Sequence, residues 1–238
     1  MGCPLSKKKQ KPRTIHVSPK KQGSANVAAK PPCNACNFPL GTDHAPAAIV
    51  NIAPTANGNR IQVALGSAEA QGSRTDSNLV FAWSGGANSS LSLDGNKYKP
   101  TQFHFHTPSE HTLDGTQFPL ELHVVHAAGD GKFVVLCFVF QYGDAEDPFL
   151  AQMWTSVPQL ASPRPSLPVG QVDGSSLVTS KQAFYRYSGP PPESVEWLVV
   201  QQPRIVTPGQ VAILFGALRT TNARVARQPT SRPVTLLS

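Results

Sequence analysis

The chain has 238 residues, of which 39% are hydrophobic and only 15% charged, and proline and glycine together fill 41 positions. This composition excludes a coiled coil or long helical bundle, and no run approaches the roughly 20 apolar residues of a membrane-spanning helix. Residues 1–42 carry eight basic side chains and no acidic one, so the net charge of +7 belongs to a leader and does not indicate a nucleic-acid-binding domain. We predict an unstructured basic leader over residues 1–45 and one folded domain over residues 46–238.

The leader begins with the letters MGCPLSKKK. Gly2 followed by a serine at position 6 is the pattern of N-terminal myristoylation, and Cys3 is a candidate for a second acyl chain. The lysines that follow attract anionic membrane surfaces, at about 1 kcal/mol for each basic residue. This predicts a cytoplasmic lipoprotein attached peripherally to the inner face of a membrane. The alternative is a solvated basic leader. The chain has no apolar stretch of the kind found in signal peptides.

Segments with strand-like alternation follow, bounded by turn residues. They are Arg60–Leu65, Leu79–Trp83, Ser90–Leu93, Tyr98–His106, Leu120–His126 and Lys132–Gln141. Apolar side chains at helical spacing predict a helix within residues 147–160, and Thr207 followed by Pro208 predicts the start of another that ends near Leu218. The Pro- and Ser-rich stretch 161–176 is predicted to be a loop. The last 20 residues hold four arginines and no acid, which is typical of a solvated segment.

Five of the seven histidines lie between positions 104 and 126. Strand periodicity puts Gln102, His104 and His106 on one face of their segment, and Glu121 and His123 on one face of theirs. If the two segments are antiparallel neighbours, three imidazoles converge on one point. Three neutral histidine nitrogens with an open fourth position are the ligands of a catalytic zinc ion, whereas a single His-x-His pair would indicate ordinary core histidines.

Several stretches resemble the α-class carbonic anhydrases. The stretches are Gln102-Phe103-His104-Phe105-His106, Ser109-Glu110-His111-Thr112, Glu121-Leu122-His123-Val124-Val125-His126, Phe184–Gly189, Trp197–Val200 and Arg232-Pro233. The resemblance covers about residue 48 to the end. It implies a mainly β fold, a single domain with a large twisted, mostly antiparallel sheet and a few short peripheral helices.

The resemblance also implies a function, the reversible hydration of CO2 to bicarbonate and a proton by attack of zinc-bound hydroxide. Carbonic anhydrase is a zinc lyase and is itself the usual example of a catalytic three-histidine zinc site. His104, His106 and His123 would bind Zn²⁺. Gln102 would orient His104 and Glu121 would orient His123 by accepting a hydrogen bond from the second ring nitrogen. The partners would be CO2 and bicarbonate, and no nucleic acid.

Further roles carry over from the same resemblance. Glu110 would be the gatekeeper carboxylate, the catalytic side chain other than the metal ligands. His111 and His126 match structural histidines of the family. The CO2 pocket would be lined by Val125, Val135 and Trp197.

The sequence departs from the family where a threonine is expected after a Tyr-x-Gly stretch. The segment between Gly189 and Trp197 is about five residues shorter than the family pattern and has no threonine. That threonine positions the hydroxide and donates to the gatekeeper, and losing such a contact costs on the order of 10²–10³ in rate. Ser188 and Ser194 are the nearby hydroxyls, and Asn59 stands where the family has a proton-shuttle histidine.

These departures leave three readings open. The first is a carbonic anhydrase of reduced activity. The second is a non-catalytic carbonic-anhydrase-like module that binds zinc and serves in interactions. The third is a cupin-type metalloenzyme, in which Glu110 would join the three histidines as a ligand.

Overall fold

The computed structural model describes residues 48–49, 54–56, 61–162, 166–189, 195–224 and 233–237. All of them belong to the unit Asn34–Ser238. The predicted leader, with Gly2 and Cys3, lies outside the described residues, so acylation, membrane attachment and a cytoplasmic location stay predictions. Among the helices of the described segments, none combines the length and apolarity needed to cross a bilayer.

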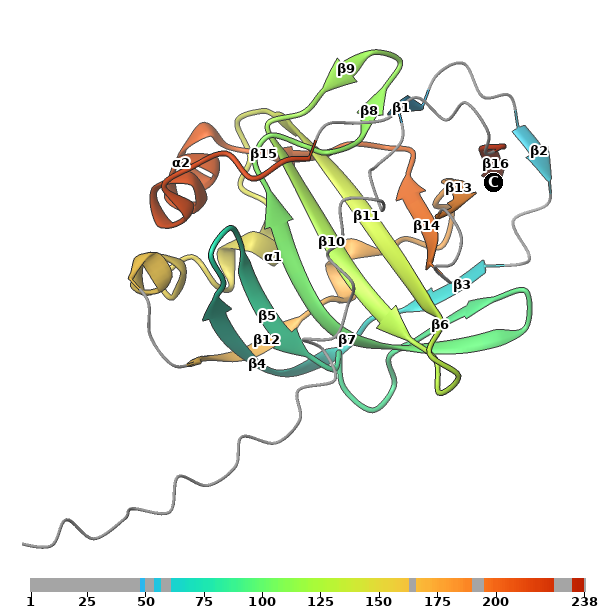
Figure 1. Ribbon diagram of the computed structural model, residues 1–238, viewed down its shortest axis with the longest axis horizontal. Coiled ribbons are helices and arrows are strands. Elements are labelled where there is room, and N and C mark those ends of the chain that lie inside the picture. The colour runs from blue at the N-terminus through green and yellow to red at the C-terminus, as the bar shows by residue number, and fades with distance from the viewer. Residues whose placement is uncertain are drawn as a thin grey trace, which may run out of the picture. The chain divides into compact units, whose positions relative to one another are not determined.

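Strands dominate the described residues (Figure 1). In chain order they are β1 (Ala48–Ile49), β2 (Pro54–Ala56), β3 (Ile61–Ala64), β4 (Ser67–Arg74), β5 (Leu79–Trp83), β6 (Ser90–Leu93), β7 (Asn96–His106), β8 (Thr112–Leu113), β9 (Thr116–Gln117), β10 (Leu120–Ala127), β11 (Phe133–Tyr142), β12 (Leu167–Asp173), β13 (Phe184–Ser188), β14 (Val195–Val200), β15 (Arg204–Val206) and β16 (Thr235–Leu237). The α-helices are α1 (Pro148–Ala151) and α2 (Pro208–Leu218), and the 3-10 helices are η3 (Val157–Ala161) and η4 (Ser175–Leu177).

One 13-stranded sheet contains most of these strands, in the order β12-β4-β5-β7-β10-β11-β14-β13-β16-β2 along its main path. Neighbours on this path pair antiparallel, except that β14 runs parallel to β11 and β2 runs parallel to β16. β15 also pairs with β11 in parallel, and a separate small sheet joins β1, β8 and β9. The predicted fold class, a large and mostly antiparallel sheet with few helices, is confirmed.

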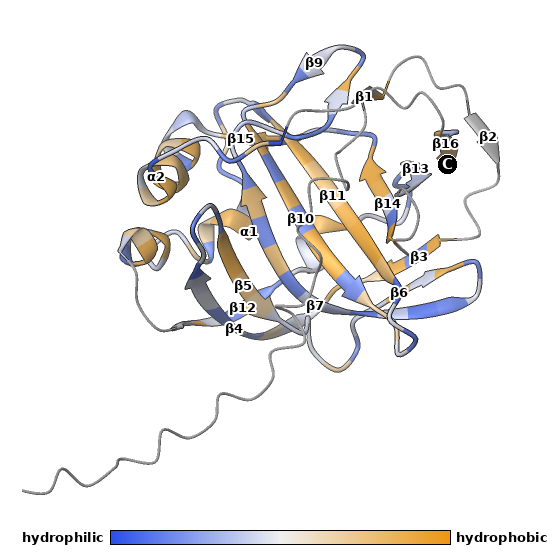
Figure 2. Ribbon diagram, viewed as in Figure 1, coloured by the Kyte–Doolittle hydropathy of each residue, from blue (hydrophilic) through white to orange (hydrophobic). Residues whose placement is uncertain are grey.

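The three central strands, β7, β10 and β11, lie side by side and separate two apolar layers (Figure 1). Along β10, Leu122 and Val124 belong to the larger core, which includes an aromatic stack of Phe81 on Phe103 with ring centroids 4.8 Å apart. Val125 belongs to a second core on the opposite face. The alternating hydropathy along β7 and β10 in Figure 2 follows from the two-residue period of a strand. Both faces of these strands are therefore buried.

Two of the sequence-based expectations about secondary structure are wrong, and one strand is absent from the prediction. The helix expected within residues 147–160 is interrupted, because α1 ends at Ala151 and the chain continues as the separate 3-10 helix η3, with Pro158 in its first turn. The loop expected over residues 161–176 contains β12, an edge strand that tolerates Pro168 through a register shift beside it. The sequence pattern does not predict β4, because the residues of this strand are mostly small or polar. The helix predicted after Thr207 is confirmed, with a capping box formed by Thr207 and Gln210.

His126 lies on the aromatic-core side of β10 and gives a pH-dependent prediction. It is wholly buried, and burial lowers its pKa to about 4 from the usual 6.5. Because the unfolded chain takes up this proton at a higher pH than the folded one, acidification from pH 7 to pH 4.5 favours unfolding. In urea unfolding of zinc-free protein, we expect wild type to lose about 2 kcal/mol more than His126→Gln over this range. Equal losses would contradict the lowered pKa.

Candidate metal centre

β7 and β10 place three histidines together. The two strands pair antiparallel with His104 opposite His123 and His106 opposite Glu121, so the neighbour relation expected from the sequence is present. The ring centroids of His104 and His106 lie 5.1 Å apart, those of His104 and His123 5.1 Å, and those of His106 and His123 4.7 Å. The ligand atoms that these side chains offer all lie within 4.8 Å of one another.

Each of the three rings keeps one nitrogen without a hydrogen-bond partner among the described residues. These atoms are Nε2 of His104, Nε2 of His106 and Nδ1 of His123, and all three are buried. A buried polar atom without a partner is costly, and such atoms are rare in folded proteins. Three of them directed at one another indicate a site built for a bound group.

The opposite nitrogen of each ring has an acceptor, which fixes the ring's tautomer. Nδ1–H of His104 donates to Gln102 Oε1 over 2.9 Å, and Nε2–H of His123 donates to Glu121 Oε1 over 2.7 Å. Nδ1–H of His106 donates to the carbonyl oxygen of Asn222 over 3.2 Å. The lone pairs therefore reside on the three converging nitrogens. Metal-ligating histidines have this arrangement in proteins.

Burial keeps two of the three histidines uncharged. Burial lowers the pKa of His104 well below its usual value, with a further lowering from the neighbouring His106 and His123. Burial also lowers the pKa of His106 to about 4. These two imidazoles are consequently neutral at physiological pH and act as ligands without first losing a proton. Three imidazole nitrogens fit zinc as the donor set.

The carboxylate of Glu121 accepts hydrogen bonds from His123 and from the neighbouring segment 110–111. Its Oε1 accepts hydrogen bonds from His123 Nε2 and, over 2.5 Å, from His111 Nδ1, and its Oε2 accepts from the backbone amides of Glu110 and His111. Burial alone would raise the pKa of Glu121, but the adjacent His111 and His123 hold it well below its usual range. Nε2 of His111 in turn accepts a hydrogen bond from the hydroxyl of Tyr187 over 2.6 Å. Both ring nitrogens of His111 are therefore hydrogen-bonded, and neither is available as a metal ligand.

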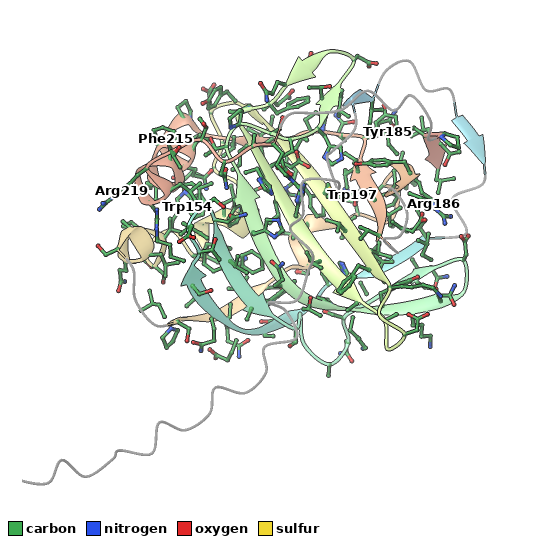
Figure 3. The ribbon with its side chains drawn as sticks, in the orientation of Figure 1. Trp154, Tyr185, Arg186, Trp197, Phe215 and Arg219 are labelled. Carbon is green, nitrogen blue, oxygen red and sulfur yellow. The ribbon has the colours of Figure 1, made fainter. Side chains whose placement is uncertain are left out.

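An apolar row adjoins the histidine cluster. Val125 on β10 lies opposite Val135 on β11, which lies opposite Trp197 on β14, and all three are fully buried. Trp197 lies on β14 beside β11 in Figure 3, and its ring centroid is 5.3 Å from that of His123. The three residues expected to line a CO2 pocket are thus neighbours in one row. Their role toward CO2 stays a prediction.

Asn222 is a site residue that the sequence reasoning missed. The backbone carbonyl of Asn222 accepts the hydrogen bond from His106 Nδ1. Its side-chain Nδ2 donates a hydrogen bond to the carbonyl of Phe105 over 2.9 Å, and its Oδ1 accepts one from the backbone amide of Thr107 over 2.9 Å. These contacts clamp the end of β7 that carries His106. No motif marks Asn222, because it lies 116 residues away from His106 along the chain.

Arg224 is the second missed residue, and it corrects the expectation that the C-terminal arginines are solvated. Its Nε donates to Glu110 Oε1 over 2.7 Å, and its Nη2 donates to Oε2 over 2.6 Å. The backbone amide of Arg224 adds a third hydrogen bond to Oε1 over 2.9 Å. Burial raises the pKa of Glu110, but His106 and Arg224 outweigh this and bring it below its usual value. The completely buried Glu110 is therefore ionised.

Three residues that stand near or in place of expected family residues are either away from the cluster or outside the described segments. Ser188 donates its hydroxyl hydrogen to the Glu196 carboxylate near the protein surface, so it is not a substitute for the missing threonine. Ser194 and Asn59 lie outside the described residues.

Fold and site together define a mainly β protein with a three-histidine cluster on its central sheet that could hold a metal ion, and the comparisons place the chain within a family. The family model described as eukaryotic-type carbonic anhydrase matches residues 51–237. The chain belongs to this family, which contradicts the cupin alternative.

Among curated proteins, dioscorin dioA3 of Dioscorea japonica is 35% identical over 150 residues, covering 60% of this chain and 55% of that protein. Alpha carbonic anhydrase 8 of Arabidopsis thaliana is 34% identical over 155 residues, covering 61% and 40%. The chain thus spans about half the length of the curated relatives it matches.

Solved structures give the same result. A dioscorin complexed with ascorbate superposes with a TM-score of 0.74 at 27% identity, covering 83% of this chain and 87% of that one. The α-carbonic anhydrase of Photobacterium profundum superposes with a TM-score of 0.72 at 25% identity, covering 83% and 90%.

Proposed function

We propose that this protein is a zinc-dependent carbonic anhydrase that interconverts CO2 and bicarbonate. The observation that carries the proposal is the convergence of three buried, unpartnered histidine nitrogens whose opposite nitrogens are all engaged. When bound, zinc supplies a Lewis acid that lowers the pKa of a coordinated water toward neutrality. His104, His106 and His123 would hold the ion.

The remaining residues have roles that follow from their contacts. Gln102 and Glu121 fix the rotation of His104 and His123, so that the lone pairs stay aimed at the metal position. The apolar row of Val125, Val135 and Trp197 packs beside His123, so nonpolar side chains border the cluster on that side, as the site of CO2, a molecule without charge or dipole, would require.

A second candidate function has specific support. The segment between Gly189 and Trp197 has no threonine, and Ser188 is bonded to Glu196 instead of facing the cluster. One matched structure is a dioscorin complexed with ascorbate. A non-catalytic module that binds zinc, and through the same site a small anion, would suit this combination.

Stopped-flow CO2 hydration by the full chain, after its zinc content has been measured, separates the two candidates. The blank is the same preparation carrying His104→Ala. We expect a rate above the blank, yet roughly 10²–10³ lower than that of an enzyme with the threonine loop, because one positioning contact is missing. A zinc-loaded protein whose rate equals the blank would reject the enzyme and favour the binding module.

A further inference from the structure

Glu110 sits between an arginine and a metal-site histidine. Its side chain is fully buried, and Arg224 supplies three hydrogen bonds to its two oxygens. The same Oε1 that receives Arg224 Nε lies 3.2 Å from Nδ1 of His106. One carboxylate oxygen thus joins a guanidinium on one side to an imidazole on the other.

His106 therefore differs from the other two histidines of the cluster in its acceptors. Its Nδ1–H donates a hydrogen bond to the carbonyl of Asn222 over 3.2 Å, and Oε1 of Glu110 lies 3.2 Å from the same nitrogen as a close electrostatic contact. The 3.2 Å separations are longer than the 2.9 and 2.7 Å contacts that hold His104 and His123. A ring held by one long hydrogen bond and one electrostatic contact loses more of its orientation when either oxygen moves.

Both acceptors are fixed by residues 222–224, which we call the C-terminal clasp. Asn222 is held to β7 by its two side-chain hydrogen bonds, and Arg224 holds Glu110 with a forked, charge-assisted pair. The forked geometry defines the plane of the carboxylate, which a single donor does not do. The position of Oε1 toward His106 is consequently set by Arg224.

We propose that Arg224 is a positioning residue for the metal site, acting through Glu110 to orient His106. In this chain the buried carboxylate places an orienting negative charge beside Nδ1–H of a metal-binding histidine, and among the described residues arginine is the partner of that carboxylate. The inference rests on the proposed three-histidine metal site, and it predicts that metal affinity depends on a residue that does not touch the metal.

The test is a zinc competition titration against a chromophoric chelator with the full chain. Arg224→Met keeps most of the side-chain stem and removes the fork, and we expect roughly 10- to 100-fold weaker zinc binding, as for other residues that orient metal ligands. Arg224→Lys retains the charge without the fork and should recover only part of the affinity. The matched control is Arg219→Met, an exposed residue at the end of α2 whose label lies at the edge of the molecule in Figure 3.

Two further readouts separate orientation from general damage to the fold. The Nδ1–H proton resonance of His106 in zinc-free protein should shift or broaden in Arg224→Met, while that of His104 stays in place. The visible spectrum of the cobalt-substituted protein should change in the same variant. In a double-mutant cycle, Glu110→Gln with Arg224→Met should bind zinc no more weakly than Glu110→Gln alone, because both act through one contact.

The outcomes are distinguishable. Zinc affinity that is equal in wild type and Arg224→Met overturns the inference, and so does an equal loss in Arg219→Met. Strict additivity in the cycle overturns the route through Glu110. If Arg224→Met does not fold, as judged by circular dichroism, Arg224→Lys carries the same comparison. A wild-type chain that takes up no zinc would instead overturn the metal site and the proposed function with it.

Discussion

Replacing His104 with alanine is expected to reduce zinc content from full occupancy to none and to remove CO2 hydration. Only two of the three converging nitrogens would remain, and Gln102 would be left with its Oε1 facing a void instead of a ring N–H. Zinc sites of this kind need three protein ligands. Atomic emission on gel-filtered protein measures the metal, and stopped-flow hydration measures the activity.

The matched control for this substitution is His126→Gln. His126 is also a buried histidine close to the cluster in sequence, but it lies on the opposite side of the sheet from His123. The control variant should keep its zinc. If His104→Ala retained zinc with unchanged affinity, the three-histidine site would be wrong.

The second large effect is expected at Glu121. Its carboxylate is surrounded by four donors, two ring N–H groups at Oε1 and two backbone amides at Oε2. Glutamine has one oxygen and one NH2 group. In Glu121→Gln, two of the four donors therefore face the NH2 group, which cannot accept a hydrogen bond. We expect a loss of about 3–5 kcal/mol in the free energy of unfolding, as when one partner of a buried ion pair is removed. Zinc affinity should fall roughly 10- to 100-fold.

Urea unfolding of zinc-free protein measures the first effect at Glu121, and chelator competition measures the second. Glu196→Gln is the control, since Glu196 is a partly exposed carboxylate that pairs with Arg186 near the surface. Exposed pairs of this kind contribute about 0–1 kcal/mol, so the control should unfold almost as the wild type does. A Glu121→Gln variant with the control's stability would show that the buried network is not energetically important.

The core of the metal site could be predicted from the sequence because it depends on local periodicity. Two strands with alternating side chains, one with His104 and His106 and one with His123, converge as soon as they pair antiparallel. The apolar row follows from the same rule, since Val125 lies two residues beyond His123 on the same face. Both features need only the knowledge that a strand repeats every two residues.

The rest of the site could not be predicted because it comes from distant parts of the chain. Asn222 and Arg224 reach His106 and Glu110 across more than a hundred residues, and nothing in the composition of the last segment separates a half-buried, paired arginine from a solvated one. The one available clue was physical. A buried, ionised Glu110 without its expected threonine needs another donor, and a cation is the strongest partner available.

The C-terminal clasp joins the candidate metal site to residues that are synthesised more than a hundred positions after His106 and Glu110. β7 and β10 are close in sequence and can pair early, while Asn222 follows His106 by 116 residues. Contacts between distant residues form late, because closing a long loop costs conformational entropy before any bond is made. We therefore expect a growing chain to bring its three histidines together before it can hold them firmly. Tight metal binding should begin only after Arg224 has left the ribosome. A chain that stops short of Asn222 would contain all three histidines and still bind metal weakly.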